Sequence, residues 1–480
     1  MSFRSELCVT VSAPTMRELR AKRDAIKEAD LVELRLDSVS DPDVAGALAD
    51  RQRPVIITCR PSWEGGWFRG SEEERHKFLF EALDLGAEYI DVEWQAGFDK
   101  SVRERGGQNI ILSMHDFNGT PTDLVDRYLA MRSTGAQVVK LAVFANRLSD
   151  ALSLLRIGRK TPMGSRVVLI AMGVAGIVSR ILAGKFGSCW TYAGDGVAPG
   201  QIEPERLLEE FRFRKITEET DVYGVLGAPL LHSLSPAMHN AGFDAIGQDA
   251  CYVPFEAKDV KDFVDFAKAL NVRGVSVTAP FKEQMLKEVA EMDDVSRTVG
   301  ALNTIRMDGQ QWQGLNTDVS GFLAPLSHVN LNGVRAAILG SGGAARAVSV
   351  ALASRRAKIE IYARNFGRST KVAQLVGGKA QALPVRQGSW DLLVNATPVG
   401  TFPHVDQTPA PEIILDGRLV YDLVYNPLRT RLIKEAELGG CQTIGGLDML
   451  VAQAERQFEW WTGERPETEV LRSAALRRMG

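Results

Sequence analysis

The sequence predicts an α/β protein, with an N-terminal (β/α)8 barrel followed by a two-lobed α/β region whose second lobe is of Rossmann type. Three observations predict this fold class. Short apolar runs alternate with amphipathic stretches through the first 200 residues. A charged helical segment and a new strand pattern follow them, and a glycine-rich turn lies between strand and helix patterns in the second half. At 480 residues, the chain is long enough for two or three domains.

The first segment contains eight strand-like runs, each followed by a helix-like or loop segment. Eight such units fit a closed barrel better than an open sheet, and a doubly wound sheet is the alternative on pattern alone. Helical patterns such as Glu72–Leu85 and Thr122–Ser133 separate the strands. The expected strands are Leu7–Val11, Leu31–Leu36, Val55–Cys59, Tyr89–Glu93, Ile110–Met114, Val138–Val143, Val167–Ala171 and Cys189–Tyr192.

The charged stretch 203–220 predicts the last barrel helix, which leads into a short connector near Arg214–Asp221. A strand at Tyr223–Leu226 then opens a second alternating region. Further on, the strings VRAAILG, GSGGAARAV and KIEIYAR form one strand–turn–helix–strand unit. The expected division is a barrel at residues 1–215, a substrate lobe at 221–328 with helices 447–480 packed back on it, and a nucleotide lobe at 329–446.

The composition excludes several classes of protein. The chain is 45% hydrophobic and 24% charged, and its formal charge of -3 provides no broad basic field for nucleic acid. The five cysteines are scattered without metal-ligand spacing, so we expect no zinc site, no other metal and no disulfide framework. The sequence has no apolar run long enough for a membrane span and no signal peptide, so a cytoplasmic location is expected.

Polar residues gather where the barrel strands end, which is where (β/α)8 barrels carry their chemistry. Lys140 lies in QVVKLAVFA, between residues that we expect to be buried. A lysine that is desolvated and surrounded by cations has a depressed pKa and can attack a ketone as a neutral amine. His115 is then the natural general acid/base. The alternative is that the lysine and histidine merely cap strand ends. The polar set at the strand ends is Glu33, Arg35, Arg60, His115, Lys140 and Arg180, of which Arg60 and Arg180 are suited to clamping a carboxylate.

Five ordered strings, VELRLD, TCRPSWEGG, SMHDF, VVKLAV and APGQ, make residues 1–212 similar to the type I 3-dehydroquinate dehydratases. The resemblance implies Lys140 as the Schiff-base lysine, His115 as acid/base and Glu64 as the group that orients the histidine. It also implies that water is removed from 3-dehydroquinate to give 3-dehydroshikimate. Val197 stands where bacterial members usually have serine, which weakens the expected substrate contact from this loop. The implied substrate-binding residues are Glu33, Arg35, Arg60, Arg180 and Gln201.

The glycine-rich turn of the second half matches G-x-G-x-x-A, with Gly340, Gly342 and Gly343 followed by Ala344. It lies between a strand and a helix, as a dinucleotide fingerprint requires. The next strand leads to Arg364 and Asn365, at the place where an NAD site has an acidic residue. An arginine there favours NADP, and a solvated surface arginine is the alternative.

The substrate lobe carries polar residues that turn or strand propensity does not explain. They occur in HSLSP, in the strand Val275–Thr278 with the following PFK, and in GLNTD. A lysine–aspartate pair can relay a proton to a ketone oxygen while a hydride arrives from the other side. Read singly, each residue is better explained as a surface charge or a turn residue than as part of a site.

Together with GGLDMLVAQ, these strings make residues 221–480 similar to shikimate dehydrogenases. The resemblance implies Lys282 and Asp318 as the catalytic pair, with Lys282 as proton donor. Two hydroxyls, at Ser233 and Ser235, favour shikimate over quinate as the substrate. The implied substrate-binding residues are Ser233, Ser235, Thr278, Asn303 and Gln453. The implied cofactor-binding residues are Gly340, Gly342, Gly343, Ala344, Arg364, Asn365, Thr397, Tyr425 and Gly446.

The product of the first resemblance is the substrate of the second, so the whole chain resembles the bifunctional dehydroquinate dehydratase–shikimate dehydrogenases. That family implies small-molecule partners, namely 3-dehydroquinate, 3-dehydroshikimate and shikimate, with NADP(H) as cofactor and neither nucleic acid nor membrane. The alternatives are a single-activity dehydrogenase with a non-catalytic barrel and a ligand-sensing protein on the same folds. The sequence leaves the oligomeric state open.

Overall fold

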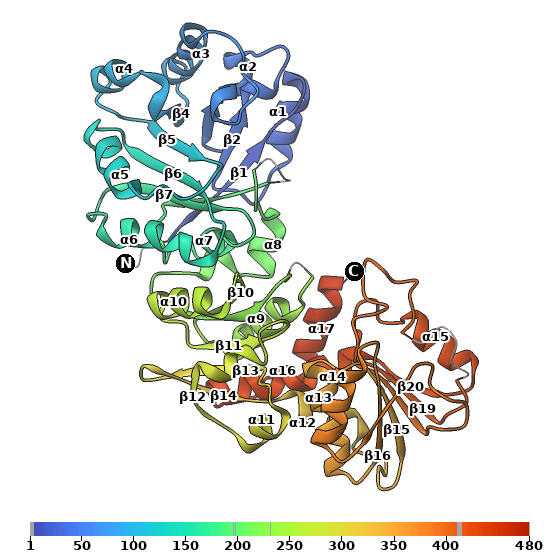
Figure 1. Cartoon of the computed structure of the whole chain (residues 1–480). Coiled ribbons are helices and arrows are strands. Elements are labelled where there is room, and N and C mark those ends of the chain that lie inside the picture. Colours follow the sequence, from blue (N-terminus) through green and yellow to red (C-terminus); the bar gives the residue numbers. More distant parts are fainter. Residues whose placement is uncertain (1–3, 195, 197, 231, 410–414, 480) are drawn as a thin grey trace. The chain divides into compact units, whose positions relative to one another are not determined.

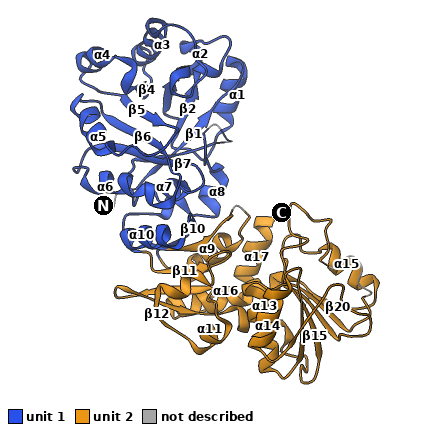
Figure 2. Ribbon diagram, viewed as in Figure 1, with its two compact units in different colours: residues 1–222, 249–271 blue, residues 223–248, 272–480 orange. Residues whose placement is uncertain are grey.

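The computed structural model describes residues 4–194, 196, 198–230, 232–409 and 415–479 (Figure 1). The chain forms two compact units, one made of residues 1–222 with 249–271 and the other of residues 223–248 with 272–480 (Figure 2). Sequence reasoning instead assigned the whole stretch after residue 221 to the second region. The domain boundaries therefore stay a prediction.

The first unit is built on a parallel eight-stranded sheet in the order β7-β6-β5-β4-β3-β2-β1-β8. A backbone hydrogen bond of 2.8 Å from Cys189 N to Val167 O joins the two ends of this order, so the barrel is nearly closed. The predicted barrel is thus confirmed, and the open doubly wound sheet is not. The strands are β1 (Glu6–Val11), β2 (Leu31–Arg35), β3 (Val55–Thr58), β4 (Tyr89–Glu93), β5 (Ile110–Asp116), β6 (Val138–Phe144), β7 (Arg166–Met172) and β8 (Trp190–Ala193).

Helices cover the outside of this barrel, and their ends follow local sequence signals. Ser71 and Glu74 form a reciprocal capping box that starts α3, because each side chain accepts from the other residue's backbone N–H. Inside the barrel, apolar side chains including Ile56, Val168 and Trp190 form a buried cluster. The helices are α1 (Met16–Ala25), α2 (Val44–Leu48), α3 (Glu72–Asp84), α4 (Asp99–Glu104), α5 (Leu124–Ser133), α6 (Leu152–Lys160), α7 (Ile177–Ile181) and α8 (Pro204–Glu209), with 3-10 turns at Leu36–Ser38, Ser62–Glu64, Trp94–Ala96, Leu148–Ala151 and Phe213–Lys215.

The first unit also holds β10 (Ala250–Glu256) and α10 (Val260–Leu270). The buried carboxylate of Asp262 explains this assignment, since it accepts hydrogen bonds from the backbone N–H groups of Leu148 (3.0 Å) and Ser149 (2.8 Å). Arg147 adds a contact of 3.1 Å from its Nε to the same carboxylate. These bonds fasten α10 to the segment that follows β6.

The second unit opens with a mixed sheet in the order β10-β9-β11-β13-β14-β12. Helices α16 and α17 pack against α9 through a cluster that includes Met238, Val451 and Leu471. The strands other than β10 are β9 (Asp221–Gly227), β11 (Gly274–Val277), β12 (Val289–Met292), β13 (Thr304–Asp308) and β14 (Gln311–Leu315). The helices are α9 (Ser235–Ala245), α11 (Asp294–Val299), α12 (Asp318–Leu323), α16 (Gly446–Thr462) and α17 (Thr468–Met479), with 3-10 turns at Gln284–Lys287 and Ala324–Leu326.

A second sheet of this unit is parallel and has the order β17-β16-β15-β18-β19-β20, which is a Rossmann arrangement. Its apolar side chains, among them Ile338, Ile361 and Val394, pack under α13 and α14. The predicted fold class is therefore confirmed for this half as well. The elements are β15 (Arg335–Leu339), α13 (Gly343–Ser354), β16 (Lys358–Tyr362), α14 (Phe366–Leu375), β17 (Lys379–Gln381), β18 (Leu392–Asn395), β19 (Leu419–Asp422), α15 (Arg431–Leu438) and β20 (Gln442–Ile444).

Candidate active sites

Lys140 lies within β6, not at its end, and its side chain is only 5% exposed inside the barrel. Its Nζ is 2.9 Å from Asp91 Oδ2 and 3.7 Å from Glu33 Oε1, and it lies 4.3 Å from the centre of the Tyr192 ring. We expected cations around this amine, but its nearest charged atoms belong to carboxylates. Without substrate, the lysine is therefore held as one partner of a buried ion pair.

Two acidic residues of β4 organise the charges around the lysine. Arg60 Nη1 donates to Glu93 Oε1 at 2.6 Å, and its Nη2 is 2.9 Å from Asp91 Oδ2. Although burial acts in the opposite direction, the charges of Arg60 and Lys140 hold the pKa of Asp91 below its ordinary value. Both ends of the Arg60 guanidinium are paired in this arrangement, and its role as a carboxylate clamp stays a prediction.

The side chains of His115 and Glu64 form a pair near the end of β5. Glu64 Oε1 is 2.9 Å from His115 Nδ1 and accepts from the His115 backbone N–H at 2.6 Å. Burial, together with the nearby charges of Arg60 and Lys140, holds the pKa of His115 well below 6.5. Burial also raises the pKa of Glu64 to about 8, against the opposing charge of Arg60. The imidazole is therefore neutral at pH 7 and able to accept a proton.

Arg180, in α7, is a buried cation without an acidic partner among the described residues. Its guanidinium donates weak hydrogen bonds to the carbonyls of Tyr192 (3.3 Å) and Pro199 (3.2 Å), and its Nε has no partner in the described part of the chain. Burial alone lowers the pKa of this arginine to about 10. An uncompensated guanidinium beside a cavity is suited to bind an anionic group of a ligand.

The remaining predicted barrel residues line the same cavity but differ in how freely they can contact a ligand. Arg35 is tied to Asp37 by two hydrogen bonds of 2.8 and 2.7 Å, whereas Gln201 reaches towards Thr10 at 3.5 Å. Val197 lies outside the described residues, so its predicted effect stays a prediction. All eight predicted residues border this cavity, namely Glu33, Arg35, Arg60, Glu64, His115, Lys140, Arg180 and Gln201.

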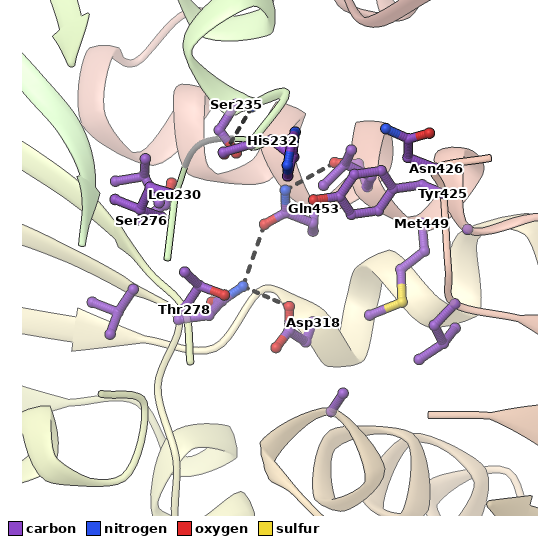
Figure 3. A pocket seen from close by; sticks show the side chains of 18 of the residues that line it. Leu230, His232, Ser235, Ser276, Thr278, Asp318, Tyr425, Asn426, Met449 and Gln453 are labelled. Carbon is purple, nitrogen blue, oxygen red and sulfur yellow. Dashed lines mark hydrogen bonds between the residues drawn. The ribbon is translucent and has the colours of Figure 1, made fainter. Parts of the chain in front are cut away.

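The second unit contains a larger cavity of about 420 Å³, lined by elements of both of its sheets (Figure 3). Thr278 and Asp318 border it from the mixed-sheet side, and Tyr425 borders it from the Rossmann side (Figure 3). The predicted residues that line the cavity are Ser233, Ser235, Thr278, Lys282, Asn303, Asp318, Ala344, Tyr425, Gly446 and Gln453.

Lys282 and Asp318 form an ion pair in this cavity, with Nζ 2.5 Å from Oδ2. Asn303 donates from Nδ2 to the other carboxylate oxygen of Asp318 at 2.8 Å, which fixes the orientation of that group. The lysine side chain is 19% exposed and the aspartate 7%, so the lysine is the more accessible of the two. This geometry can deliver a proton from an ammonium that a buried carboxylate holds in place.

The amide of Asn303 also connects this pair to the C-terminal helix α16. Its Nδ2 lies 3.3 Å from Gln453 Oε1, and dashed lines in Figure 3 mark this contact and the one to Asp318. One turn further along α16, Gln457 accepts from Ser276 Oγ at 2.7 Å and donates to Thr304 Oγ1 at 3.0 Å. Amides and hydroxyls thus surround the ion pair, as a polyhydroxylated ligand would require.

The Rossmann lobe has the backbone features that a dinucleotide needs. Gly340 has φ +120°, and a Cβ there would lie 2.8 Å from Ala396 O, so a side chain is excluded from the turn. Gly342 caps α13, whose N-terminus points its free backbone N–H groups out of the turn. At Gly446 a Cβ would lie 2.3 Å from Leu423 O, so this glycine allows α16 to start against the end of β19. These residues fit a bound pyrophosphate.

Gly340, Gly342 and Gly343 lie outside the large cavity, and so do the three remaining predicted cofactor residues, Arg364, Asn365 and Thr397. Arg364 is exposed after β16, where no described residue encloses its guanidinium. Asn365 caps α14, with its side-chain oxygen accepting from Arg368 N at 3.0 Å, so its amide has a structural role. Thr397 Oγ1 donates to Asn395 Oδ1 at 2.7 Å, beside Gly340. Of these three, Arg364 is the side chain free to meet a phosphate.

Comparison with known proteins matches each part of the chain. Family models match residues 7–218 as type I 3-dehydroquinase, 225–305 as shikimate dehydrogenase substrate binding domain and 446–476 as shikimate 5'-dehydrogenase C-terminal domain. The chain is 33% identical to the chloroplastic bifunctional 3-dehydroquinate dehydratase/shikimate dehydrogenase of Arabidopsis thaliana, over 96% of this chain and 82% of that protein. The chain belongs to the bifunctional 3-dehydroquinate dehydratase/shikimate dehydrogenase family.

Two further matches concern the second half of this dehydratase–dehydrogenase. It is 40% identical to the shikimate dehydrogenase (NADP(+)) of Methanopyrus kandleri, over 55% of this chain and 98% of the relative. A solved shikimate dehydrogenase in complex with NADP+ superposes with a TM-score of 0.52 at 34% identity, covering 55% of this chain and 98% of its own. The relatives therefore match the dehydrogenase half almost from end to end.

Sequence reasoning missed several residues of this dehydratase–dehydrogenase that contact the predicted site residues. In the barrel these are Asp91 and Glu93, and the signal was present, because YIDVE places two acids two positions apart in a buried strand. In the dehydrogenase cavity it is Gln457, four residues after Gln453 and so on the same face of α16.

Proposed function

We propose that this chain catalyses two consecutive reactions of the shikimate pathway. The barrel dehydrates 3-dehydroquinate to 3-dehydroshikimate, and the second unit reduces that product to shikimate with NADPH. The proposal rests on one observation. The buried Lys140 shares a cavity with a neutral His115 and with Arg180, a buried cation that has no acidic partner among the described residues. A lysine, a base and an anion site are the three groups that imine-based dehydration of a keto acid needs.

In the barrel, Arg180 binds the substrate carboxylate and so gains the counter-ion that it lacks. Lys140 gives its proton to the neutral His115 of the same cavity, and its nitrogen then adds to the ketone carbon. The ketone oxygen leaves as water, and a protonated imine joins the lysine to the substrate. This positive nitrogen draws electrons from the adjacent carbon, so a proton on that carbon becomes removable.

His115 takes that proton with its free Nε2, while Glu64 holds Nδ1 and fixes the ring. The electron pair forms the new carbon–carbon double bond, and the neighbouring hydroxyl takes the proton from His115 and leaves as water. A second water then hydrolyses the imine and releases Lys140. One water is consumed and two are produced, so the net reaction is a single dehydration.

In the second unit, NADPH supplies a hydride to the carbonyl carbon when it is bound. Lys282 donates a proton to the carbonyl oxygen, and Asp318 keeps the ammonium aimed at that oxygen. Asn303 holds Asp318 in turn, while Ser233, Ser235, Thr278 and Gln453 meet the hydroxyls and the carboxylate of the ring. Arg364 is placed to bind the 2′-phosphate that distinguishes NADP from NAD.

A single assay tests both activities together. The purified chain is given 3-dehydroquinate and NADPH with no other enzyme, and the loss of NADPH absorbance is followed. We expect steady consumption by the wild type. Lys140→Ala stops consumption from 3-dehydroquinate but not from 3-dehydroshikimate, and Asp318→Asn slows consumption from both. Absence of NADPH consumption from 3-dehydroquinate, with consumption from 3-dehydroshikimate intact, would reject the dehydratase half.

No helix among the described residues has the length and apolar character that a membrane span requires. The cytoplasmic location and the exclusion of nucleic acid rest on composition alone and stay predictions. Small-molecule substrates of the shikimate pathway agree with the family that the chain belongs to.

A further inference from the structure

A chain of ion pairs runs from the outside of the barrel to the amine of Lys140. From Glu72 on α3, the contacts pass to Arg75 (2.6 Å, Nη2 to Oε2), and then from Arg75 Nη1 to Glu93 Oε2. Arg60 Nη1 binds the other oxygen of Glu93 at 2.6 Å. We call these side chains, with Asp91 as the last member, the buried ion-pair chain. Asp91 ends it, 2.9 Å from both Arg60 Nη2 and Lys140 Nζ.

Of the two members of the buried ion-pair chain that come from α3, Arg75 is the one that is fully buried. It lies in the first turns of α3, is fully buried, and does not line the cavity of Lys140. Besides its acidic partners, its Nη1 donates to Cys59 O at 3.3 Å, next to Arg60 in the sequence. Its guanidinium therefore contacts both Glu93 and the backbone that carries Arg60.

Positive and negative side chains alternate along the buried ion-pair chain, so the placement of each side chain depends on that of the next. Glu93 is completely buried and has Arg75 on one oxygen and Arg60 on the other. Burial raises the pKa of this carboxyl, while the two arginines oppose that shift. Without Arg75, Glu93 keeps only Arg60 as a counter-ion, and Arg60 must reorient towards it. That movement withdraws Arg60 from Asp91, which then pairs with Lys140 alone.

We propose that Arg75 is a positioning residue of the dehydratase site, which sets the placement of Lys140 through Glu93, Arg60 and Asp91. This inference rests on the proposed function of the barrel. Arg75 touches neither the cavity nor Lys140, so it acts only through the other members of the buried ion-pair chain. The guanidinium is suited to the task because its planar fork can hold Glu72 and Glu93 at once, in fixed directions.

The test compares Arg75→Met and Arg75→Lys with a matched control, Arg23→Met. Arg23 is also a buried arginine on a barrel helix, but its contacts are to Asp24 and Ala47 O, which are not members of the buried ion-pair chain. Each full-length variant is mixed with 3-dehydroquinate and borohydride. The end-point number of adducts per chain counts the competent barrels, and the rate of adduct formation reports how well each barrel places its lysine. Oxidation of shikimate by the same chain reports the folding of the second unit.

We expect Arg75→Met to form close to one adduct per chain at a rate at least ten-fold below that of the wild type, with kcat for dehydration reduced in parallel. Arg75→Lys, which keeps the charge but not the fork, should recover part of the rate, and Arg23→Met should match the wild type. A wild-type rate in Arg75→Met would overturn the proposal. So would a fall confined to the number of adducts, because that pattern indicates lost folding only.

Should Arg75→Met fail to fold, Arg75→Lys decides alone: a slow rate at full adduct number supports the proposal, and a wild-type rate rejects it. Wild-type chain that forms no adduct at all would instead reject the proposed function, so the two failures are distinguishable.

Discussion

Replacement of Arg180 by methionine should make the protein more stable and the dehydratase much weaker. Burial lowers the pKa of Arg180 from 12.5 to about 10, because no acidic group among the described residues compensates its charge. That shift corresponds to a cost of about 3 kcal/mol for keeping the guanidinium charged in the folded protein. The cost is fully present below pH 10, where the side chain is charged in both the folded and the unfolded chain.

Methionine removes this cost while filling much of the same space. It also removes the two long hydrogen bonds to Tyr192 O and Pro199 O, which together offset about 1–2 kcal/mol. The expected net gain is about 1–2 kcal/mol, or roughly 2–6 °C in the unfolding temperature of a unit of this size. The loss of a charge-assisted contact to the substrate carboxylate should lower kcat/KM for dehydration by about 10–100-fold.

Differential scanning calorimetry without substrate measures the first effect, and dehydration kinetics measure the second. Shikimate oxidation by the same chain is the control and should not change. A variant less stable than the wild type would show that Arg180 carries no unpaired charge. Unchanged kcat/KM for dehydration would remove it from the anion site.

Three further perturbations test other parts of the structure. Arg364→Ala should raise KM for NADP much more than for NAD, by about 1–3 kcal/mol in binding terms, and an unchanged NADP/NAD preference in shikimate oxidation would exclude it from the 2′-phosphate site. Glu64→Gln should change stability in a pH-dependent way, because burial raises the pKa of Glu64 to about 8 from 4.5. The folded wild type keeps this proton between those pH values and loses stability as pH rises, so the variant should gain about 4 kcal/mol relative to wild type between pH 5 and pH 9 in thermal unfolding; an equal difference at both pH values would contradict the buried, protonated carboxyl. Gln457→Leu should lower kcat for shikimate oxidation several-fold while leaving dehydration intact, since it frees Ser276 and the backbone of Asn303; wild-type kcat would show that these contacts do not position the ion pair.

The sequence was sufficient to predict the barrel and most of its site because the signals are local. Each strand is an apolar run, and Lys140 and His115 interrupt such runs with side chains that have chemical uses. Side chains two positions apart in a strand point to the same face, so the sequence also indicates that Asp91 and Glu93 lie on one side of β4. Such local patterns therefore predict both the fold class and the candidate catalytic residues.

What surrounds Lys140 could not be predicted, because it depends on the register between strands. The parallel pairing places Ser113 opposite both Glu93 and Lys140, and Asp91 of β4 reaches the amine of β6 across β5. Strand tilt and closure of the barrel set this register, and no single segment of the sequence determines either of them. For the same reason the sequence did not show that two carboxylates bind Arg60, whose contact with the substrate stays a prediction.

The assignment of β10 and α10 was another non-local outcome. Their sequence continues the alternating pattern of the second half, but Asp262 bonds to the backbone after β6 and joins them to the first unit. A single buried aspartate at the start of a helix looks like an ordinary helix-capping residue in sequence, and its partners lie more than a hundred positions away.

Covalent trapping of the substrate tests most directly whether the barrel works through an imine. The full chain is incubated with 3-dehydroquinate and borohydride, digested, and mapped by mass spectrometry. We expect one reduced adduct, on Lys140, which Lys140→Ala abolishes. An adduct on another lysine, or turnover of 3-dehydroquinate with Lys140 left unmodified, would contradict the mechanism.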